Sequence, residues 1–307
     1  MKPCSRATRA ACREHPNAPA HRRAITRVVN EHASEDDLRP AELAELAGHI
    51  ARRAGRLLMD NLPFGRYRGS VETKGARELV SRVDRESEEL ILEHIAEAYP
   101  DHALLGEEGG ARLAPVERAR YRWIIDPLDG TTNYLHGHPF FAVSIGVERL
   151  HANDAPDLVA GAVFAPYFGE LFLAARGVGA FLNTPVIPLA VSDTATLEDA
   201  LVSTGFAYER ERWPNDARFV RAEERTRGVR RCGAAALDLA YVAAGRYDGF
   251  WELGLKPHDV AAGALLVREA GGRVTDFEGG PSWLDGGRIV AAPPQLHEAL
   301  RALVAPA

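Results

Sequence analysis

One stretch, WIIDPLDGTTNYLHGHPFFAVSIG at residues 123–146, constrains the fold of this chain more than any other. An apolar, strand-forming run leads directly into two carboxylates, Asp126 and Asp129, and then into Gly-Thr-Thr at residues 130–132. Pro127 fixes its own φ angle, so a strand, an acidic turn and a helix start are expected in this order. Exposed amides at a helix start suit an anion, and paired carboxylates suit Mg²⁺ or Mn²⁺. The stretch predicts a metal-assisted phosphate site, although an acidic turn with a helix cap would explain the same residues in isolation.

Length and charge limit the classes of function. The chain has 307 residues, which is enough for two lobes, and its net charge is −6, from 37 Lys and Arg against 43 Asp and Glu. This balance gives no general electrostatic reason to bind nucleic acid or a membrane, while a small phosphorylated substrate remains possible. Three cysteines without a CxxC pair argue against a disulfide framework or a structural zinc site. We therefore expect a cytoplasmic protein without a membrane segment.

Composition divides the chain into three parts. Residues 1–40 are rich in arginine and poor in apolar residues, and we expect a mobile basic arm there. This arm, or the basic face of residues 210–231, could contact nucleic acid; for the arm, a solvated extension, or a start assigned too far upstream, is the simpler interpretation. Residues 41–190 are predicted to form an N-terminal α+β unit with most of the acidic positions, and residues 191–307 a C-terminal α/β unit.

Acidic residues recur where strands end and helices begin. Asp84 comes just before an expected amphipathic helix, and Glu107 and Glu108 follow the apolar run HALLG. In the C-terminal unit, Glu252 ends a strand-like run and Asp259 lies at a helix start. Each position has an ordinary explanation as a cap or a solvated side chain. Because sites in α/β sheets form outside the carboxyl ends of strands, these carboxylates can also converge.

Three other motifs give little indication of a catalytic or cofactor-binding site. GVGAFLN at residues 177–183 lacks the third glycine and the following helix of a dinucleotide loop, so we interpret it as a hairpin turn. Ser144 lies in VSIG within an expected strand and gives little support for a serine hydrolase. The arginines of residues 210–231 are interpreted as a solvated helical face.

Three segments resemble the inositol monophosphatases of bacterial type. They are GEE at residues 106–108, the stretch at residues 123–146, and GAAALDLAYVAAGRYDGFWELGLKPHDVAAGALLVREAGG at residues 233–272. The resemblance covers roughly residues 42–305. It implies an α/β (α+β) fold, a layered α-β-α-β-α sandwich of the inositol monophosphatase and fructose-bisphosphatase type. It also implies a homodimer.

The resemblance implies a site with two or three Mg²⁺ ions, with Mn²⁺ as a possible substitute. The residues that would hold or border the metals are Glu107, Asp126, the backbone carbonyl of Leu128, Asp129 and Asp259, with Lys74 near the cluster. One position departs from the family, which usually has an aromatic residue where His258 precedes Asp259. We hypothesise that this histidine alters metal affinity or makes it pH-dependent.

The resemblance also assigns the chemistry. Asp84 and Thr131 would orient and deprotonate the attacking water, with Glu107 counted among the catalytic residues. The amides of Gly130 and Thr131 would receive the phosphate, while Glu252 and the backbone near Ala235 would contact the substrate's hydroxyls.

The function predicted in this way is a Mg²⁺-dependent phosphomonoesterase that hydrolyses myo-inositol monophosphate to inositol and phosphate. A metal-activated water would attack in line. Fructose 1,6-bisphosphate, histidinol phosphate or a nucleotide phosphate are alternative substrates, because the leaving group is selected outside the metal core. A different class is a regulatory protein that keeps the phosphatase fold and binds RNA or a transcription complex.

Overall fold

The computed structural model describes residues 38–62, 71–73, 79–107, 119–150, 157–184 and 186–305. Residues Arg39–Ala307 form one compact unit. The basic arm before residue 38 lies outside the described residues, and the division of the folded part near residue 190 stays a prediction. None of the helices in the described ranges is long and apolar enough to cross a membrane.

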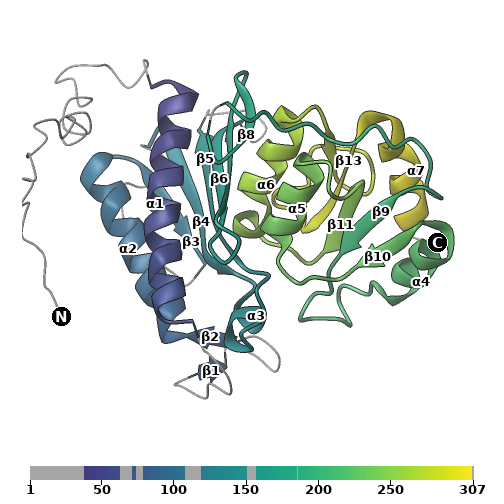
Figure 1. The fold of residues 1–307 in the computed structure, drawn as a ribbon, viewed down its shortest axis with the longest axis horizontal. Coiled ribbons are helices and arrows are strands. Elements are labelled where there is room, and N and C mark those ends of the chain that lie inside the picture. Colours follow the sequence, from purple (N-terminus) through teal and green to yellow (C-terminus); the bar gives the residue numbers. More distant parts are fainter. Residues whose placement is uncertain are drawn as a thin grey trace, which may run out of the picture. The chain divides into compact units, whose positions relative to one another are not determined.

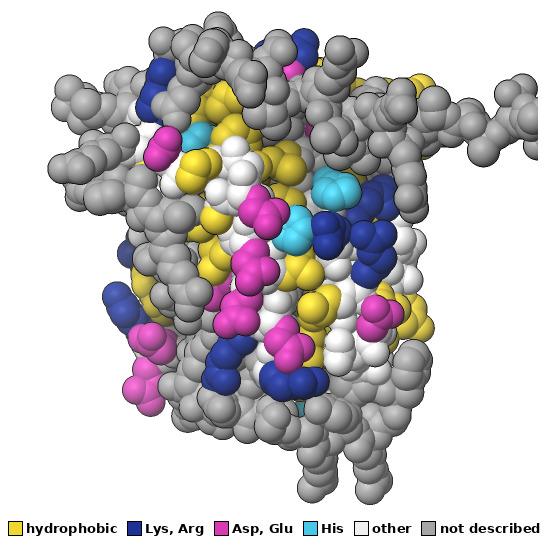
Figure 2. Space-filling view, turned by 90° about the vertical axis from the view of Figure 1, so that its left-hand side faces the viewer, with side chains coloured by type: hydrophobic (Ala, Val, Ile, Leu, Met, Phe, Trp, Pro, Cys, Tyr) yellow, Lys and Arg dark blue, Asp and Glu magenta, His cyan; other side chains and the backbone are white. Residues whose placement is uncertain are grey.

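The first helical layer consists of α1 (Pro40–Asp60) and α2 (Arg82–Ala98). Pro40 starts α1, where its missing N–H costs no hydrogen bond, and the buried positions of the helix recur at helical spacing from Leu43 to Leu58. Figure 2 shows the outer side of this layer, where acidic side chains lie close to arginine and histidine. Such mixed charge is typical of a solvated face.

A six-stranded sheet forms the second layer (Figure 1). Its order is β3-β4-β5-β6-β7-β8, with β3 parallel to β4 and the other neighbours antiparallel. The strands are β3 (Ala103–Gly106), β4 (Tyr121–Asp129), β5 (Ala142–Arg149), β6 (Asp157–Ala165), β7 (Glu170–Ala175) and β8 (Gly179–Leu182). The turn between β7 and β8 is the hairpin predicted at GVGAFLN. A separate pair, β1 (Val71–Thr73) and β2 (Leu79–Ser81), precedes α2.

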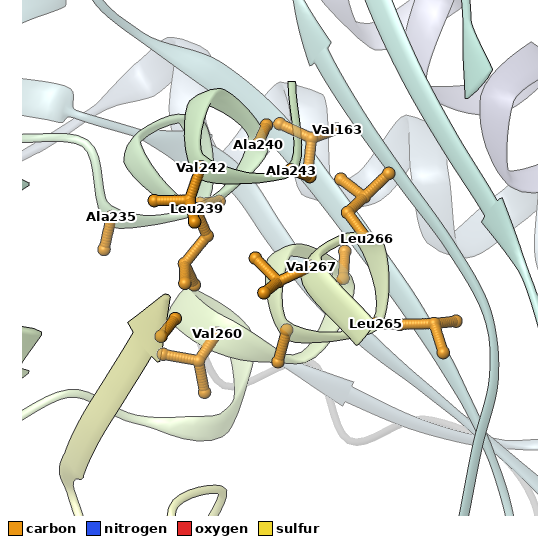
Figure 3. Packing of buried hydrophobic residues seen from close by; sticks show 14 of the residues in the cluster. Val163, Ala235, Leu239, Ala240, Val242, Ala243, Val260, Leu265, Leu266 and Val267 are labelled. Carbon is orange, nitrogen blue, oxygen red and sulfur yellow. The ribbon is translucent and has the colours of Figure 1, made fainter. Parts of the chain in front are cut away.

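The central layer is a pair of small-residue helices, α5 (Ala235–Ala243) and α6 (Pro257–Glu269). They pack against each other with Leu239, Val242, Val260 and Val267 in their buried cluster (Figure 3). All of α5 except Tyr241 is buried, and in α6 His258 and every residue from Val260 to Val267 are buried, as expected of helices covered on most sides. The small side chains let both neighbouring layers approach closely.

A five-stranded sheet of order β10-β9-β11-β13-β12 forms the fourth layer. Its strands are β9 (Leu201–Thr204), β10 (Gly228–Arg230), β11 (Gly249–Leu253), β12 (Arg273–Thr275) and β13 (Arg288–Ala292). Helices α4 (Asp216–Arg225) and α7 (Pro294–Val304) complete the stack, and α3 (Thr131–Leu135) follows β4. The structure therefore confirms the predicted α-β-α-β-α arrangement.

Two local predictions were wrong in detail. Strand β4 does not end before the acidic pair but continues to Asp129, with a shift in its register to β5 between Asp126 and Asp129. Helix α2 begins at Arg82, so Asp84 lies in its first turn and not before it. In β4, pairing with β5 extended the strand beyond its local pattern.

Candidate active site

The register shift in β4 builds the centre of the site. Asp126 and Asp129 lie on either side of the shift and are 2% and 6% exposed, so both carboxylates are removed from bulk water. The Leu128 N–H donates to Asp126 Oδ1 over 3.0 Å, which closes the irregular segment on itself. A bulge of this kind redirects side chains at the end of a strand. It leaves two buried acids three residues apart.

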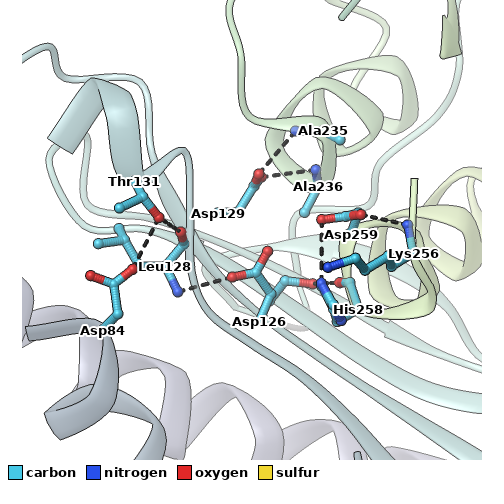
Figure 4. A network of polar contacts seen from close by, with 11 residues as sticks. Asp84, Asp126, Leu128, Asp129, Thr131, Ala235, Ala236, Lys256, His258 and Asp259 are labelled. Carbon is cyan, nitrogen blue, oxygen red and sulfur yellow. Dashed lines mark hydrogen bonds and ion pairs between the residues drawn. The ribbon is translucent and has the colours of Figure 1, made fainter. Parts of the chain in front are cut away.

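The Asp129 carboxylate lies at the N-terminus of α5 (Figure 4). The amides of Ala235 and Ala236 donate to its Oδ1 and Oδ2 over 3.0 and 2.9 Å, and the Leu237 amide lies 3.3 Å from Oδ2. These amides have no partner within the helix, and the helix dipole favours negative charge at this end. Asp129 therefore joins β4 to the central helical layer. The Ala235 amide, which belongs to the backbone predicted to contact substrate hydroxyls, is already engaged by this carboxylate.

Thr131 and Asp84 lie together, as predicted. Thr131 Oγ1 is 3.0 Å from Asp84 Oδ1 and 3.1 Å from the Leu128 carbonyl oxygen, two acceptors for its single proton (Figure 4). Asp84 is 1% exposed. The Ser87 hydroxyl donates to the Pro127 carbonyl over 3.0 Å, which ties α2 to the irregular part of β4. The lone pairs of the threonine hydroxyl remain able to accept a hydrogen bond.

Asp259 is the third residue of α6 and reaches the same region from the central layer. Its Oδ2 accepts the Lys256 N–H over 2.6 Å, so it also caps its own helix. The Nε2 atom of His258 lies 3.8 Å from Asp259 Oδ1, and the histidine is buried. The cap expected from the sequence is present, and it does not prevent the side chain from lining the pocket.

Burial and mutual repulsion raise the pKa of the central carboxyl groups. For Asp126, burial is the main cause and the charges of Glu107, Asp129 and Asp259 add to it, so its pKa lies well above 3.8. Burial, with Asp259 beside it, raises the pKa of Asp129 to about 8, although three amides act in the opposite direction. Clustered carboxylates that repel one another are the usual setting for a bound cation.

Glu252 is buried on β11 and does not face solvent. Gly205 provides its space: a Cβ atom at that glycine would lie 2.2–2.3 Å from both carboxylate oxygens and Cδ of Glu252. Burial first, and then the charges of Asp259 and Asp129, raises the pKa of Glu252 well above 4.5. Burial and the charge of Glu252 likewise raise the pKa of Asp238 on α5.

One pocket of about 260 Å³ gathers almost all of the predicted site. Asp84 does not line it but reaches it through Thr131, and Lys74 lies outside the described residues. The predicted residues that line the pocket are Glu107, Asp126, Leu128, Asp129, Gly130, Thr131, Ala235, Glu252 and Asp259.

His258, singled out in the sequence, also lines the pocket, but other parts of its wall were not singled out. Asn133, Phe206, Tyr208, Trp213 and Arg231 also line it. Arg231 corrects the interpretation of residues 210–231 as a solvated helical face, because the helix in this region, α4, ends at Arg225. A weak signal existed, since Arg231 lies two residues before the Gly233 that opens the last recognisable motif.

The model of the inositol monophosphatase family matches residues 39–306. The chain belongs to this family. It is 44% identical over 268 residues to Nus factor SuhB of Pseudomonas aeruginosa, covering 86% of this chain and 96% of the relative. It is also 44% identical over 255 residues to inositol-1-monophosphatase of Mesorhizobium japonicum, covering 81% and 91%.

Solved structures of family members share the fold. Extragenic suppressor protein suhB from Bartonella henselae superposes with a TM-score of 0.76 at 39% identity, over 86% of this chain and 98% of that one. Inositol monophosphatase from Anabaena gives a TM-score of 0.73 at 41% identity, over 86% and 95%. The family membership supports a phosphatase.

Inositol monophosphatases are generally metal-dependent, and the donor chemistry of this pocket fits a hard divalent cation. In the described part of the chain, no three acidic, histidine or cysteine side chains meet at one metal-binding point. Amide hydrogen bonds engage Asp126, Asp129 and Asp259. Each carboxylate offers about four lone-pair sites, so an oxygen bonded to an amide can still bind a cation. A cation would also offset the repulsion that raises the pKa values.

Proposed function

We propose that this protein is a Mg²⁺-dependent phosphatase that hydrolyses myo-inositol monophosphate. One observation carries the proposal: the four carboxylates of Glu107, Asp126, Asp129 and Asp259 line one pocket with Thr131. Phosphate is itself anionic, so these acids would repel it unless cations are bound between them. Related enzymes named inositol-1-monophosphatase support the choice of substrate.

The metal would be held by Glu107, Asp126, Asp129, Asp259 and the Leu128 carbonyl, as two or three Mg²⁺ ions or as Mn²⁺. When bound, it lowers the pKa of water and neutralises charge on the phosphoryl oxygens. The residues of the protein hold the metal-binding carboxylates in position. Hydrogen bonds to backbone amides fix the carboxylates of Asp129 and Asp259, so little reorganisation is needed during the reaction.

Thr131 and Asp84 would handle the nucleophile. The Thr131 hydroxyl donates toward Asp84 and the Leu128 carbonyl, which leaves its oxygen to accept a proton of the attacking water. Asp84 then receives the proton through the threonine hydroxyl. The amides of Gly130 and Thr131 lie at the start of α3, with Gly130 at φ +89°, and would bind the phosphate oxygens.

Glu252 and the backbone at Ala235 would bind the leaving group. The Glu252 carboxylate can accept hydroxyl hydrogens from the floor of the pocket. The Ala235 amide already donates to Asp129, so its role would be to hold that carboxylate while the Ala235 backbone borders the substrate. Lys74, proposed near the metals, is a further position that substitution can test.

Phosphate release from a panel of esters tests the proposal. The panel contains myo-inositol 1-phosphate, fructose 1,6-bisphosphate, histidinol phosphate and a nucleotide phosphate, each with and without Mg²⁺. We expect the inositol ester to give the highest kcat/KM, with no turnover in excess chelator. A higher kcat/KM for another ester would change the proposed substrate and leave the metal-dependent chemistry in place. Turnover that is unaffected by chelator would refute the proposed metal dependence.

A role in transcription is a second candidate because several relatives are named Nus factor SuhB. It is compatible with catalysis, since the acidic set is complete in this chain. Salt-dependent retention of RNA by the full chain, lost when residues 1–38 are removed, would support it. Equal retention by both forms would exclude the basic arm as the contact. We also propose a cytoplasmic homodimer, which sedimentation of the full chain would test.

A further inference from the structure

The segment that follows β9 contributes an aromatic wall to the pocket. Phe206, Tyr208 and Trp213 all line it, within eight residues of Gly205. Arg210 lies 4.8 Å from the ring centre of Phe206, which covers that ring with a cation. Aromatic rings beside a polar cavity provide flat apolar surface for a ligand. The three rings differ in how much of their surface is exposed.

Trp213 is a fixed part of the wall. A Cβ atom at Gly254 would lie 2.8 Å from Cδ1 and 3.0 Å from Cγ of the indole, so the ring lies directly on the glycine backbone. Arg212 and Arg288 lie 5.3 and 5.7 Å from its centre. The Trp213 Cζ2 and Cη2 atoms also approach Gly287 closely. This ring supports the segment and has little surface left to offer.

Tyr208 is different, because it lines the pocket and is still 53% exposed. A ligand that covers this ring would remove apolar surface from water, which is favourable. The ring also costs little conformational entropy to order, since a tyrosine side chain has two rotatable angles. Of the three rings, Tyr208 therefore has the most surface to gain from a bound leaving group.

The floor of the same pocket is polar. The Glu252 carboxyl group packs against Gly205, three residues before Tyr208, and its oxygens can form hydrogen bonds with hydroxyl groups of a ligand. A leaving group that satisfies both surfaces has hydroxyls at its edge and C–H groups on its face. A hydroxylated ring has this form, whereas an open-chain polyol has no flat face.

We propose that Tyr208 is a specificity-determining residue that covers one face of a hydroxylated ring in the leaving group. This inference rests on the proposed phosphatase function. Because the contact is the same in the ground state and in the transition state, it lowers KM for cyclic esters and leaves kcat unchanged. Acyclic phosphate esters gain little from it.

The test compares wild type with Tyr208→Ala and Tyr208→Phe on three esters: myo-inositol 1-phosphate, glucose 1-phosphate and glycerol 2-phosphate. For the cyclic esters, Tyr208→Ala should raise KM about tenfold at unchanged kcat, the lower end of what a modest apolar contact contributes. Tyr208→Phe should retain the wild-type values. For glycerol 2-phosphate, all three proteins should have the same KM.

Tyr167→Ala is the matched control, because Tyr167 is 49% exposed and does not line the pocket. It should match wild type on every ester. An equal loss on cyclic and acyclic esters, or no change for Tyr208→Ala, would overturn the role of Tyr208. If wild type hydrolyses glucose 1-phosphate but not the inositol ester, the proposed substrate fails while the comparison of ring with chain still tests Tyr208. Absence of turnover on every ester would refute both.

Discussion

Substitution of Gly146 by alanine tests how the central helical layer positions the site. Gly146 lies on β5, where helix α6 approaches the six-stranded sheet. A Cβ atom there would lie 2.8 Å from the Ala261 Cβ and 3.3 Å from the Ala262 nitrogen. Carbon atoms prefer about 3.5–4.0 Å, so the helix must retreat by roughly 1 Å. Asp259 lies two residues before Ala261 and would move with it.

The expected cost follows from overpacking. An extra methyl group in a close-packed core destabilises the folded state by about 1–3 kcal/mol. Replacing glycine by alanine also lowers the conformational entropy of the unfolded chain, which stabilises the folded state by about 0.4–1 kcal/mol. The net change is about 1–2 kcal/mol, which in a unit of this size lowers Tm by about 2–8 °C. Because Asp259 shifts, the affinity for Mg²⁺ should also fall.

Calorimetric unfolding of Gly146→Ala, Ala261→Gly and the double variant provides the measurement. Removing the Ala261 methyl group relieves the closest contact. The loss of unfolding free energy in the double variant should therefore be about 1 kcal/mol smaller than the sum of the losses in the two single variants. Ala261→Gly alone carries the ordinary cost of glycine in a helix, about 1 kcal/mol. Strictly additive losses, or a wild-type Tm for Gly146→Ala, would refute the close approach of α6 to β5.

Three further predictions concern the site. Because the pKa of Asp126 is raised, the metal-free folded protein binds more protons than the unfolded chain once the pH exceeds the ordinary aspartate pKa of 3.8, so its Tm should fall as the pH rises above that value. The Tm of Asp126→Asn should fall less over the same range, and parallel curves for the two proteins would contradict this. Gly205→Ala should displace the Glu252 carboxylate and raise KM, and unchanged kinetics would disprove the tight fit. Thr131→Val should lower kcat about 10²–10⁴-fold, whereas Thr131→Ser, which keeps the hydroxyl, should retain most of it.

Elements that depend on local chemistry can be predicted from the local sequence. The hydrophobic spacing of α1 and the small-residue pattern of α5 and α6 follow directly from which faces are buried. The Gly130 helix start was also predictable, because a left-handed conformation favours glycine. These features need only neighbours in the sequence.

Features that depend on partners far along the chain were not predictable from residue patterns. Strand β4 continues through the acidic pair because β5 pairs with it on both sides of the register shift. Asp129 meets the amides of α5 across more than a hundred residues, so the Ala235 N–H already has a partner within the protein. Tyr208 and Arg231 line the pocket through the placement of loops, and loops carry no periodic signal.

The central claim is that the carboxylates of the pocket bind a divalent cation, and calorimetric titration of the metal-free protein with MgCl₂ tests it most directly. The raised pKa of Asp126 and the value of about 8 for Asp129 mean that binding near neutral pH should release protons. We predict saturable binding whose heat depends on the ionisation enthalpy of the buffer, and much weaker binding for Asp126→Asn. No saturable binding, or equal affinity in Asp126→Asn, would contradict the claim.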